Sequence, residues 1–393
     1  MPIRVAIVDD SPFTCGLLAE YLADKPGVKV IGSAHSGVAA IELVKRLKPD
    51  VLTLDVEMPD ADGVSVLRRL MRESPLPVVM VSGLSRRAAE ITHTAITEGA
   101  VDFVLKYSSS SNLDTAAFER DFATRVRAAA RRHCTVGRAL LPVASTRDTH
   151  QIAIQLGQTS KSARPTNRDS TSIIVIGSST GGPSALQQLF AEWPHGLNAA
   201  IIIVQHMPVG FTKTLALQLD RLSEITVREA ADGDPLVVGT ALVVPGDFHL
   251  VVNNDHRVEL TQSEKVSGHR PSIDVTMQSV ANTFGSRAIG VILTGMGHDG
   301  VEGLAAIHSV GGTTLAQDAD SCVVNGMPQR AIDRHVVNFI GPPAAIGAEL
   351  VRQTSASQRI SDLDVSSKLT RSVSFEVAHL RFNPEGSQRL AGG

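Results

Sequence analysis

The sequence predicts an α/β protein of two domains, because short apolar runs alternate with helix-length segments in two separate stretches of the chain. The chain has 393 residues, which is about twice the usual size of one domain. Hydrophobic residues make up 43% of the chain and charged residues 20%, as is typical of proteins that bury a core. We expect domains at 1–130 and 172–353, a flexible linker at 131–171, and a mostly flexible tail at 354–393.

Five apolar runs, each followed by a helical pattern, make up the first domain. The runs lie at 3–8, 28–33, 51–54, 78–81 and 103–105, and we expect helices at 12–23, 37–47, 62–73, 86–97 and 114–132. Several of these helices begin near Pro, Ser or Asp, which favour a helix start. Nearly continuous apolar strands indicate a parallel sheet that is buried on both faces. Functional side chains should therefore gather beyond the carboxyl ends of the strands.

The second domain repeats this alternation after a polar segment. Residues 133–170 are rich in Thr, Ser, Arg and Gln, and such a composition buries too little apolar surface to offset the entropy of ordering. Apolar runs return at 173–176, 200–204, 241–244 and 288–293, with helices expected at 183–192, 211–222, 272–284 and 300–309. This pattern predicts a doubly wound, mostly parallel α/β domain.

The composition argues against several protein classes. Lys and Arg number 37 against 40 Asp and Glu, a net charge of −3, and this balance does not favour a nucleic-acid-binding protein. Cys15, Cys134 and Cys322 are scattered, so neither a disulfide framework nor a zinc site is expected. The start of the chain does not resemble a signal peptide, and no stretch reaches the roughly 18 apolar residues of a membrane helix. We expect a cytoplasmic protein that is not inserted in a membrane.

Acidic residues follow the strands of the first domain. Asp9 and Asp10 end the first run, Asp55 ends the third, and Ser82 and Lys106 end the fourth and fifth. Carboxylates at one rim repel each other unless a hard cation such as Mg²⁺ neutralises them. With a lysine and a hydroxyl beside them, they suit phosphoryl transfer to a carboxylate. Alternatively, the aspartates only cap the following helices and the lysine forms a surface ion pair.

The order and spacing of these residues resemble the receiver domain of two-component response regulators. The resemblance covers residues 2–130 and rests on Val8-Asp9-Asp10-Ser11, Leu54-Asp55-Val56-Glu57-Met58-Pro59 with Asp62-Gly63, Val81-Ser82, and Phe103-Val104-Leu105-Lys106. It implies a flavodoxin-like (βα)5 fold. One departure is Tyr107, because receivers usually have a proline after the lysine.

The receiver resemblance assigns a role to each matching residue. Asp55 is implied as the phosphoryl acceptor, and Asp9 and Asp10 are implied as ligands of Mg²⁺ together with Asp55 and the backbone carbonyl of Glu57. Ser82 and Phe103 are implied as the switch pair, and Lys106 as the contact to the phosphoryl group.

A turn of small residues opens the second domain. Ile173-Ile174-Val175-Ile176 leads into Gly177-Ser178-Ser179-Thr180-Gly181-Gly182-Pro183, a strand followed by a turn and a helix that begins at proline. Free N–H groups at such a turn either cradle a phosphate or surround a nucleophile of the G-x-S-x-G type. The next strand ends in Gln205-His206-Met207-Pro208 and not in an acidic residue, which favours a serine hydrolase over a dinucleotide-binding site.

His206 and Asp299 follow strands of the same domain. A histidine beside the turn serine can act as a general base, and Asp299, in Thr294-Gly295-Met296-Gly297-His298-Asp299-Gly300, can orient its imidazole. Alternatively, His206 is an ordinary loop histidine and Asp299 caps the next helix. His298 is the nearest rival to Asp299 as a functional residue. The chain order Ser, His, Asp differs from that of α/β-hydrolases.

Four segments of this domain resemble the catalytic domain of bacterial chemotaxis protein-glutamate methylesterases. They are Gly177-Ser178-Ser179-Thr180-Gly181-Gly182, Gln205-His206-Met207-Pro208 with Gly210-Phe211-Thr212, Pro245-Gly246, and Leu293-Thr294-Gly295-Met296-Gly297-His298-Asp299-Gly300. The resemblance covers about 172–350, and an upstream receiver is part of that family's architecture. Two departures are Ser178, where the family more often has alanine, and His298, where it often has asparagine.

The methylesterase resemblance implies Ser179 as nucleophile, His206 as base and Asp299 as its partner. The backbone N–H of Met296 is implied in the oxyanion hole, and the N–H of Thr180, the residue after the nucleophile, is a plausible second donor. Ser178 raises the question of which serine attacks, and the place of Ser179 in the motif favours Ser179.

The implied activity is hydrolysis of glutamate γ-methyl esters, with release of methanol, on the cytoplasmic helices of chemoreceptors. Deamidation of receptor glutamines is a second implied activity, and neither needs a cofactor beyond the Mg²⁺ of the receiver. A chemotaxis histidine kinase is the implied phosphodonor. We expect the unphosphorylated receiver to pack over the Ser179 rim and phosphorylation of Asp55 to favour an open arrangement. The alternatives are a receiver-regulated binding module without hydrolase activity and a DNA-binding regulator, for which the second domain lacks a basic helix-turn-helix pattern.

Overall fold

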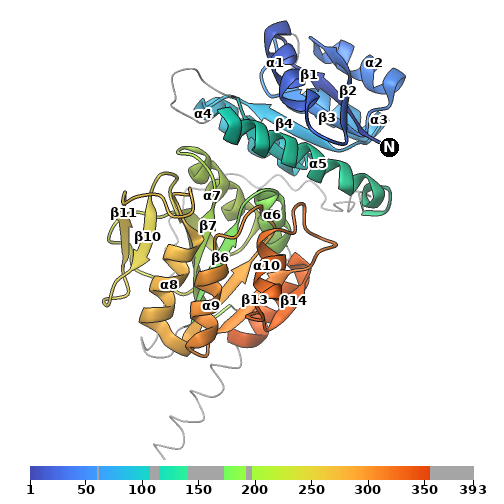
Figure 1. The fold of residues 1–393 in the computed structure, drawn as a ribbon. Coiled ribbons are helices and arrows are strands. Elements are labelled where there is room, and N and C mark those ends of the chain that lie inside the picture. Colours follow the sequence, from blue (N-terminus) through green and yellow to red (C-terminus); the bar gives the residue numbers. More distant parts are fainter. Residues whose placement is uncertain (60–61, 107–114, 140–171, 192–196, 355–393) are drawn as a thin grey trace, which may run out of the picture.

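The computed structural model describes residues 1–59, 62–106, 115–139, 172–191 and 197–354, with side chains omitted at 115–117 and 132–139. These residues form two α/β domains, and Figure 1 shows the first domain lying against one end of the second. Tyr107, most of the predicted linker at 131–171 and nearly all of the tail at 354–393 lie outside the described residues.

The first domain is a five-stranded parallel sheet in the order β2-β1-β3-β4-β5. The strands are β1 (Ile3–Val8), β2 (Val28–Ala34), β3 (Val51–Asp55), β4 (Val78–Ser82) and β5 (Asp102–Leu105). The helices are α1 (Pro12–Ala23), α2 (Gly37–Leu47), α3 (Gly63–Glu73), α4 (Arg86–Thr97) and α5 (Thr115–Ala139). Apolar side chains of α1 and α5 pack on one face of the sheet and those of α2, α3 and α4 on the other, so the doubly wound prediction is confirmed.

The helix starts follow the sequence pattern. The side chains of Ser11, Ser36, Asp62 and Ser85 each accept a hydrogen bond from a backbone N–H of the first turn, which satisfies a donor that the helix itself leaves free. The last helix differs from the prediction, because α5 continues to Ala139 instead of ending near 132. The first residues of the segment predicted as linker are therefore helical.

The second domain is built on a seven-stranded parallel sheet in the order β14-β13-β12-β6-β7-β9-β8. The strands are β6 (Ser172–Ser178), β7 (Ala199–Gln205), β8 (Thr226–Glu229), β9 (Thr240–Val243), β12 (Ala288–Ile292), β13 (Thr313–Gln317) and β14 (Phe339–Gly341). A separate antiparallel pair is formed by β10 (His249–Val252) and β11 (Val258–Thr261). The apolar runs of the sequence do not predict five of these strands, which are short: β8, β10, β11, β13 and β14.

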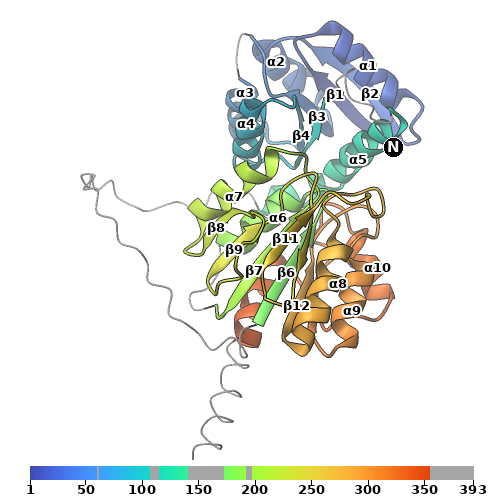
Figure 2. The same ribbon diagram turned by 90° about the vertical axis from the view of Figure 1, so that its left-hand side faces the viewer.

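Helices cover both faces of this sheet, as the turned view in Figure 2 shows. Residues of α6 (Gly182–Ala191), α7 (Phe211–Leu222) and a last helix at 343–354 pack on one face. Residues of α8 (Ile273–Phe284), α9 (Val301–Ser309) and α10 (Met327–Asp333) pack on the other, and a short 3-10 turn, η2 (Gly285–Arg287), follows α8. The carboxyl ends of β6, β7 and β12 therefore meet at one rim, beneath the first domain.

Candidate active site

Three carboxylates and a lysine meet at the rim of the first sheet, as predicted. Lys106 Nζ lies 2.9 Å from Asp9 Oδ2 and 2.8 Å from Asp55 Oδ2. Burial and the charge of Asp9 raise the pKa of Asp55, Lys106 lowers it, and the balance leaves the pKa at about 6. The rim therefore holds more buried negative charge than one ammonium group balances.

The same carboxylates fit a hard divalent cation. Asp9, Asp10 and Asp55 each offer an oxygen, and these oxygens lie within 4.8 Å of one another. Carboxylate oxygens are the ligands that Mg²⁺ prefers. Glu57 lies in the turn after Asp55, where its N–H donates to Asp55 Oδ1 at 3.4 Å, so the backbone of Glu57 belongs to the same rim.

The two predicted switch residues contact α4 and the second domain. Ser82 is fully buried and its hydroxyl accepts a hydrogen bond of 2.7 Å from Thr92 Oγ1 on α4. Phe103 is buried and its ring stacks on Phe211 of the second domain, with 5.5 Å between centroids and 8° between planes. The switch pair thus connects the rim to α4 and to the contact between the domains.

Adjacent serines at the end of β6 have different surroundings. Ser178 is fully buried, and its hydroxyl donates to Gln205 Oε1 at 2.6 Å. Ser179 is half-buried and lines a cavity of about 350 Å³ together with His206. Ser178 is the last residue of β6, which is buried on both faces, and Ser179 begins the turn after it, so of the two serines only Ser179 lines the cavity.

Gln205 ties the serine turn to the histidine turn. Its Nε2 donates to the backbone carbonyls of Ser179, at 3.0 Å, and His206, at 3.3 Å. Gly182 leaves room for this amide, because a Cβ there would lie 2.0 Å from Gln205 Oε1. The sequence motif contained Gln205, but its role depends on contacts that only the folded chain shows.

His206 and Asp299 form the pair that the sequence predicted. His206 Nε2 and Asp299 Oδ2 are 2.8 Å apart. An ionised carboxylate only accepts hydrogen bonds, so Nε2 carries a proton, and in the neutral imidazole Nδ1 then keeps a lone pair. Nδ1 is buried and has no hydrogen-bond partner among the described residues, which leaves it free to accept a proton.

Asp299 is held as a carboxylate by the start of α8. Its oxygens accept hydrogen bonds from the Ser272 hydroxyl at 2.8 Å and from the backbone N–H groups of Ile273 at 2.7 Å and Asp274 at 3.1 Å. Burial favours a raised pKa for Asp299, but the bonds from His206, Ile273 and Ser272 hold it well below its usual value. The helix N-terminus adds to this effect, since its dipole favours negative charge. His298, by contrast, has an exposed side chain.

Two backbone N–H groups beside Ser179 are available as oxyanion donors. Among the hydrogen bonds of the described residues, the N–H groups of Thr180 and Met296 have no acceptor. Neighbouring groups fix the two turns, because Ser179 N donates to Thr294 O at 3.0 Å and Thr294 Oγ1 donates to Thr180 O at 2.9 Å. A Cβ on Gly295 would lie 2.9 Å from Ser179 Cβ, so the turn before Met296 lies directly against the serine.

The cavity at Ser179 lies between the two domains. Its lining includes Phe103, Lys106 and Arg125 from the first domain and Ser179, His206 and Pro208 from the second. Asp102 Oδ2 accepts a bond of 3.2 Å from Gly181 N, and Arg125 Nη1 lies 2.6 Å from the same oxygen. A carboxylate of the first domain thus contacts the end of the serine turn, just before α6, a contact that the sequence motifs did not indicate.

A buried histidine makes a second contact between the domains. His93, on α4, is fully buried, and its Nε2 donates to the backbone carbonyl of Phe211 at 3.1 Å. Burial lowers the pKa of His93 to about 4, which the bond to Phe211 offsets only in part. A neutral imidazole is therefore part of the contact between α4 and α7.

Both domains match known families. Residues 174–350 match the CheB methylesterase family and residues 5–118 match the response regulator receiver domain. A protein-glutamate methylesterase/protein-glutamine glutaminase from Symbiobacterium thermophilum is 43% identical over 354 residues, which are 89% of this chain and 97% of that protein. A protein of the same name from Pyrococcus abyssi is 38% identical over 353 residues, 89% of this chain and 93% of that protein. The crystal structure of the Thermotoga maritima CheB methylesterase catalytic domain is 42% identical, with a TM-score of 0.45, and the match covers 47% of this chain and 98% of that one.

Proposed function

Because the chain belongs to the CheB methylesterase family and carries a receiver domain, we infer that it is a phosphorylation-regulated hydrolase of chemoreceptor glutamate γ-methyl esters. Its relatives are named protein-glutamate methylesterase/protein-glutamine glutaminase, and the same chemistry deamidates receptor glutamines. The observation that carries the assignment of the site is the 2.8 Å bond between His206 and Asp299 beside a cavity that Ser179 also lines.

In the first step, the Ser179 hydroxyl attacks the ester carbonyl and His206 Nδ1 takes its proton. The imidazolium that forms is stabilised by Asp299, whose carboxylate stays ionised through the bonds from α8. The negative charge on the carbonyl oxygen is stabilised by the N–H groups of Met296 and Thr180. His206 then returns the proton to the leaving oxygen, and methanol departs from an acyl-enzyme.

In the second step, His206 takes a proton from water, and the resulting hydroxide attacks the acyl-enzyme. Breaking the bond to Ser179 releases the receptor glutamate, with the proton returned to the serine oxygen. A glutamine side chain enters the same sequence, with ammonia leaving in place of methanol. Each turnover leaves one more negative charge on the receptor.

Asp55 is the phosphoryl acceptor in this proposal, with Asp9, Asp10 and the Glu57 carbonyl joining it in binding Mg²⁺. The ion would neutralise charge on the transferred phosphoryl group, while Lys106 contacts its oxygens. A phosphoryl group on Asp55 draws the Ser82 hydroxyl away from Thr92, and the end of α4 then shifts together with Phe103. These are the elements that contact the catalytic domain, so phosphorylation weakens that contact and opens the Ser179 cavity.

The partners in this proposal are the cytoplasmic helices of chemoreceptors as substrate and a chemotaxis histidine kinase as phosphodonor. A cytoplasmic location agrees with these partners. Within the described residues, no helix is long and apolar enough to span a membrane. A binding module without hydrolase activity is not favoured, because it gives no reason for a histidine to be paired with a carboxylate beside Ser179.

Methanol release from methylated receptor membranes tests the proposal. The assay compares the wild type with Ser179→Ala and Ser178→Ala, each with and without a small phosphodonor and Mg²⁺. We expect Ser179→Ala to lose at least about 1,000-fold in rate, as nucleophile loss does in serine hydrolases, and Ser178→Ala to keep most of it. Asp55→Asn should abolish the response to the phosphodonor. No release by the wild type under any condition would refute the hydrolase, and loss confined to Ser178→Ala would refute Ser179 as nucleophile.

A further inference from the structure

A second imidazole lies flat against the proposed general base. The rings of His206 and His269 are stacked with 3.8 Å between centroids and 9° between planes. The side chain of His206 is only 8% exposed. Its ring is therefore held at one edge by Asp299 and on one face by His269, two contacts in different directions.

The segment that carries His269 is a tight turn with little freedom. Val266 and His269 exchange two backbone hydrogen bonds, of 3.1 Å and 2.9 Å, and Ser267 and Gly268 between them have positive φ angles. Such paired bonds close a two-residue hairpin turn. The backbone of His269 is thus fixed immediately beside the site.

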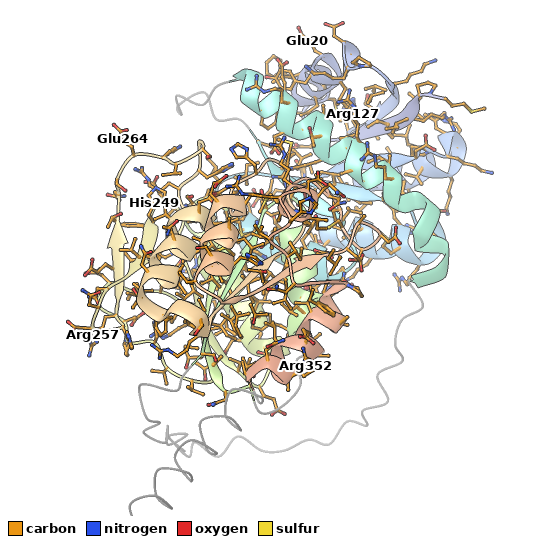
Figure 3. All side chains as sticks on the ribbon, turned by 60° about the horizontal axis from the view of Figure 1, so that its bottom comes forward. Glu20, Arg127, His249, Arg257, Glu264 and Arg352 are labelled. Atoms are coloured by element: carbon orange, nitrogen blue, oxygen red, sulfur yellow. The ribbon has the colours of Figure 1, made fainter. Side chains whose placement is uncertain are left out.

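Two buried or half-buried side chains anchor this turn to the catalytic domain. Arg270 donates to the carbonyls of Gln262 and Ser263, at 2.9 and 2.8 Å, and pairs with Asp247 at 2.7 Å. His249, which Figure 3 labels beside Glu264 on the β10 side of the domain, donates from Nε2 to the Glu264 carbonyl at 3.1 Å. His249 Nδ1 accepts from Ser272 N at 3.2 Å, so one imidazole joins the turn to the start of α8.

His269 is a neutral ring in this position. Burial, together with the neighbouring His206, lowers its pKa to about 4. The charged and titratable groups that act on it are His206, Asp299, His298 and Lys265, of which only Asp299 favours its protonated form. A neutral aromatic face next to His206 tolerates the imidazolium of the reaction, whereas a second cation at that distance would oppose it.

We propose that His269 is a positioning residue for the general base: its ring face holds the His206 imidazole in the plane in which Nε2 meets Asp299 and Nδ1 serves Ser179. The inference rests on the proposed hydrolase function and adds a residue to its machinery. In this proposal His269 itself exchanges no proton and acts only through the His206 ring on which it stacks. What it supplies is a flat, uncharged surface that prevents the base from rotating.

The test is the steady-state rate of methanol release by the full chain, activated with phosphodonor and Mg²⁺, on methylated receptor membranes. His269→Ala removes the stacked face, and His269→Phe keeps a flat ring that cannot transfer a proton. His308→Ala, which removes an exposed histidine of α9, is the control. Thermal denaturation and the extent of Asp55 phosphorylation are measured for each variant, so that a folding or activation defect is recognised.

We expect His269→Ala to lower kcat about 10- to 100-fold with KM within about twofold, because a misplaced catalytic group costs rate and not substrate binding. His269→Phe should stay within about threefold of the wild type. An unchanged kcat in folded His269→Ala would overturn the inference, as would a rise in KM alone, which would make His269 a substrate contact. A Phe variant as slow as the Ala variant would also overturn it, because the imidazole nitrogens would then be needed.

Failure of this inference is distinct from failure of the proposed function. If Ser179→Ala abolishes methanol release while His269→Ala has the wild-type kcat, the hydrolase stands and the positioning role falls. If Ser179→Ala releases methanol at the wild-type rate, the proposed site itself is wrong.

Discussion

Replacing His93 with glutamine should remove a pH-dependent opening of the contact between the two domains. In the closed arrangement His93 is fully buried against the catalytic domain and its Nε2 bonds to the Phe211 carbonyl. Burial lowers its pKa to about 4, whereas a solvated histidine has a pKa of about 6.5. If opening exposes His93 to water, protons bind the open arrangement more tightly than the closed one.

The sign and size follow from linkage. A histidine whose pKa is lowered in the closed state stabilises that state fully when the pH is above the ordinary pKa of histidine. This stabilisation of the closed state is lost as the pH falls from about 6.5 toward 4. At pH 5.5 the exposed ring is about ten-to-one protonated and the buried ring is almost entirely neutral. The closed state therefore loses about 1.4 kcal/mol relative to pH 8, a tenfold shift toward the open arrangement.

The assay is the ratio of methanol release without phosphodonor to release with phosphodonor, measured from pH 8 to pH 5.5. Both rates depend on the titration of the catalytic groups, so this dependence cancels in the ratio. For the wild type the ratio should rise about tenfold as the pH falls. Glutamine at position 93 can still donate to the Phe211 carbonyl but does not titrate, so the ratio of the variant should stay flat.

His308→Gln is the matched control, because it removes an exposed histidine from α9. Its ratio should follow that of the wild type at every pH. A ratio that rises equally in the wild type and in His93→Gln would refute the reasoning, since the opening would then depend on other groups. Asp55 phosphorylation must be saturated at each pH, so that the denominator reports the fully activated enzyme.

Three further changes have outcomes that the structure predicts. Asp299→Asn should reduce methanol release by about 10³- to 10⁴-fold with little change in KM, and a loss below tenfold would contradict the assigned partner of the base. Gly182→Ala should lower the free energy of unfolding, measured by thermal denaturation, by about 1–3 kcal/mol, because its Cβ would lie 2.0 Å from Gln205 Oε1. Gly16→Ala is the control and should not destabilise the protein, because a Cβ there meets nothing within 4 Å. Phe103→Leu removes an aromatic stack worth about 0.5–1.5 kcal/mol, so release without phosphodonor should rise about 2- to 12-fold, and an unchanged basal rate would count against the closed contact.

The sequence was sufficient for the main sheets and for the rims where the sites lie. Runs of apolar residues indicated parallel strands, and the carboxyl ends of parallel strands meet at one edge. Asp55 and Lys106 were therefore expected together, as were His206 and Asp299, and each pair is in contact. Strands such as β8 and β13 were missed, because Thr, Arg, Glu and Gln make up most of them and leave no apolar run that distinguishes them from a loop.

Several features depended on contacts between distant residues, which no local pattern specifies. His269 and His206 lie on different loops, and only the anchoring of the 262–270 segment by Arg270 and His249 brings their rings together. The bond between Asp102 and Gly181 crosses from one domain to the other. Such contacts depend on how whole helices, strands and loops pack together. In the sequence, each of these residues looks like an ordinary polar residue.

By itself, the sequence determined which residue types stand at the ends of which strands, because strand and helix periods are local properties of the chain. Only the tertiary structure shows that Ser178 and Ser179 have different surroundings, because Ser178 ends a strand that is buried on both faces and Ser179 begins the turn after it. Ser178 is enclosed with its hydroxyl on Gln205, and Ser179 lines the cavity with His206. The same packing placed Phe103 and His93 between the domains, so the contact that we propose to regulate the site lies next to it.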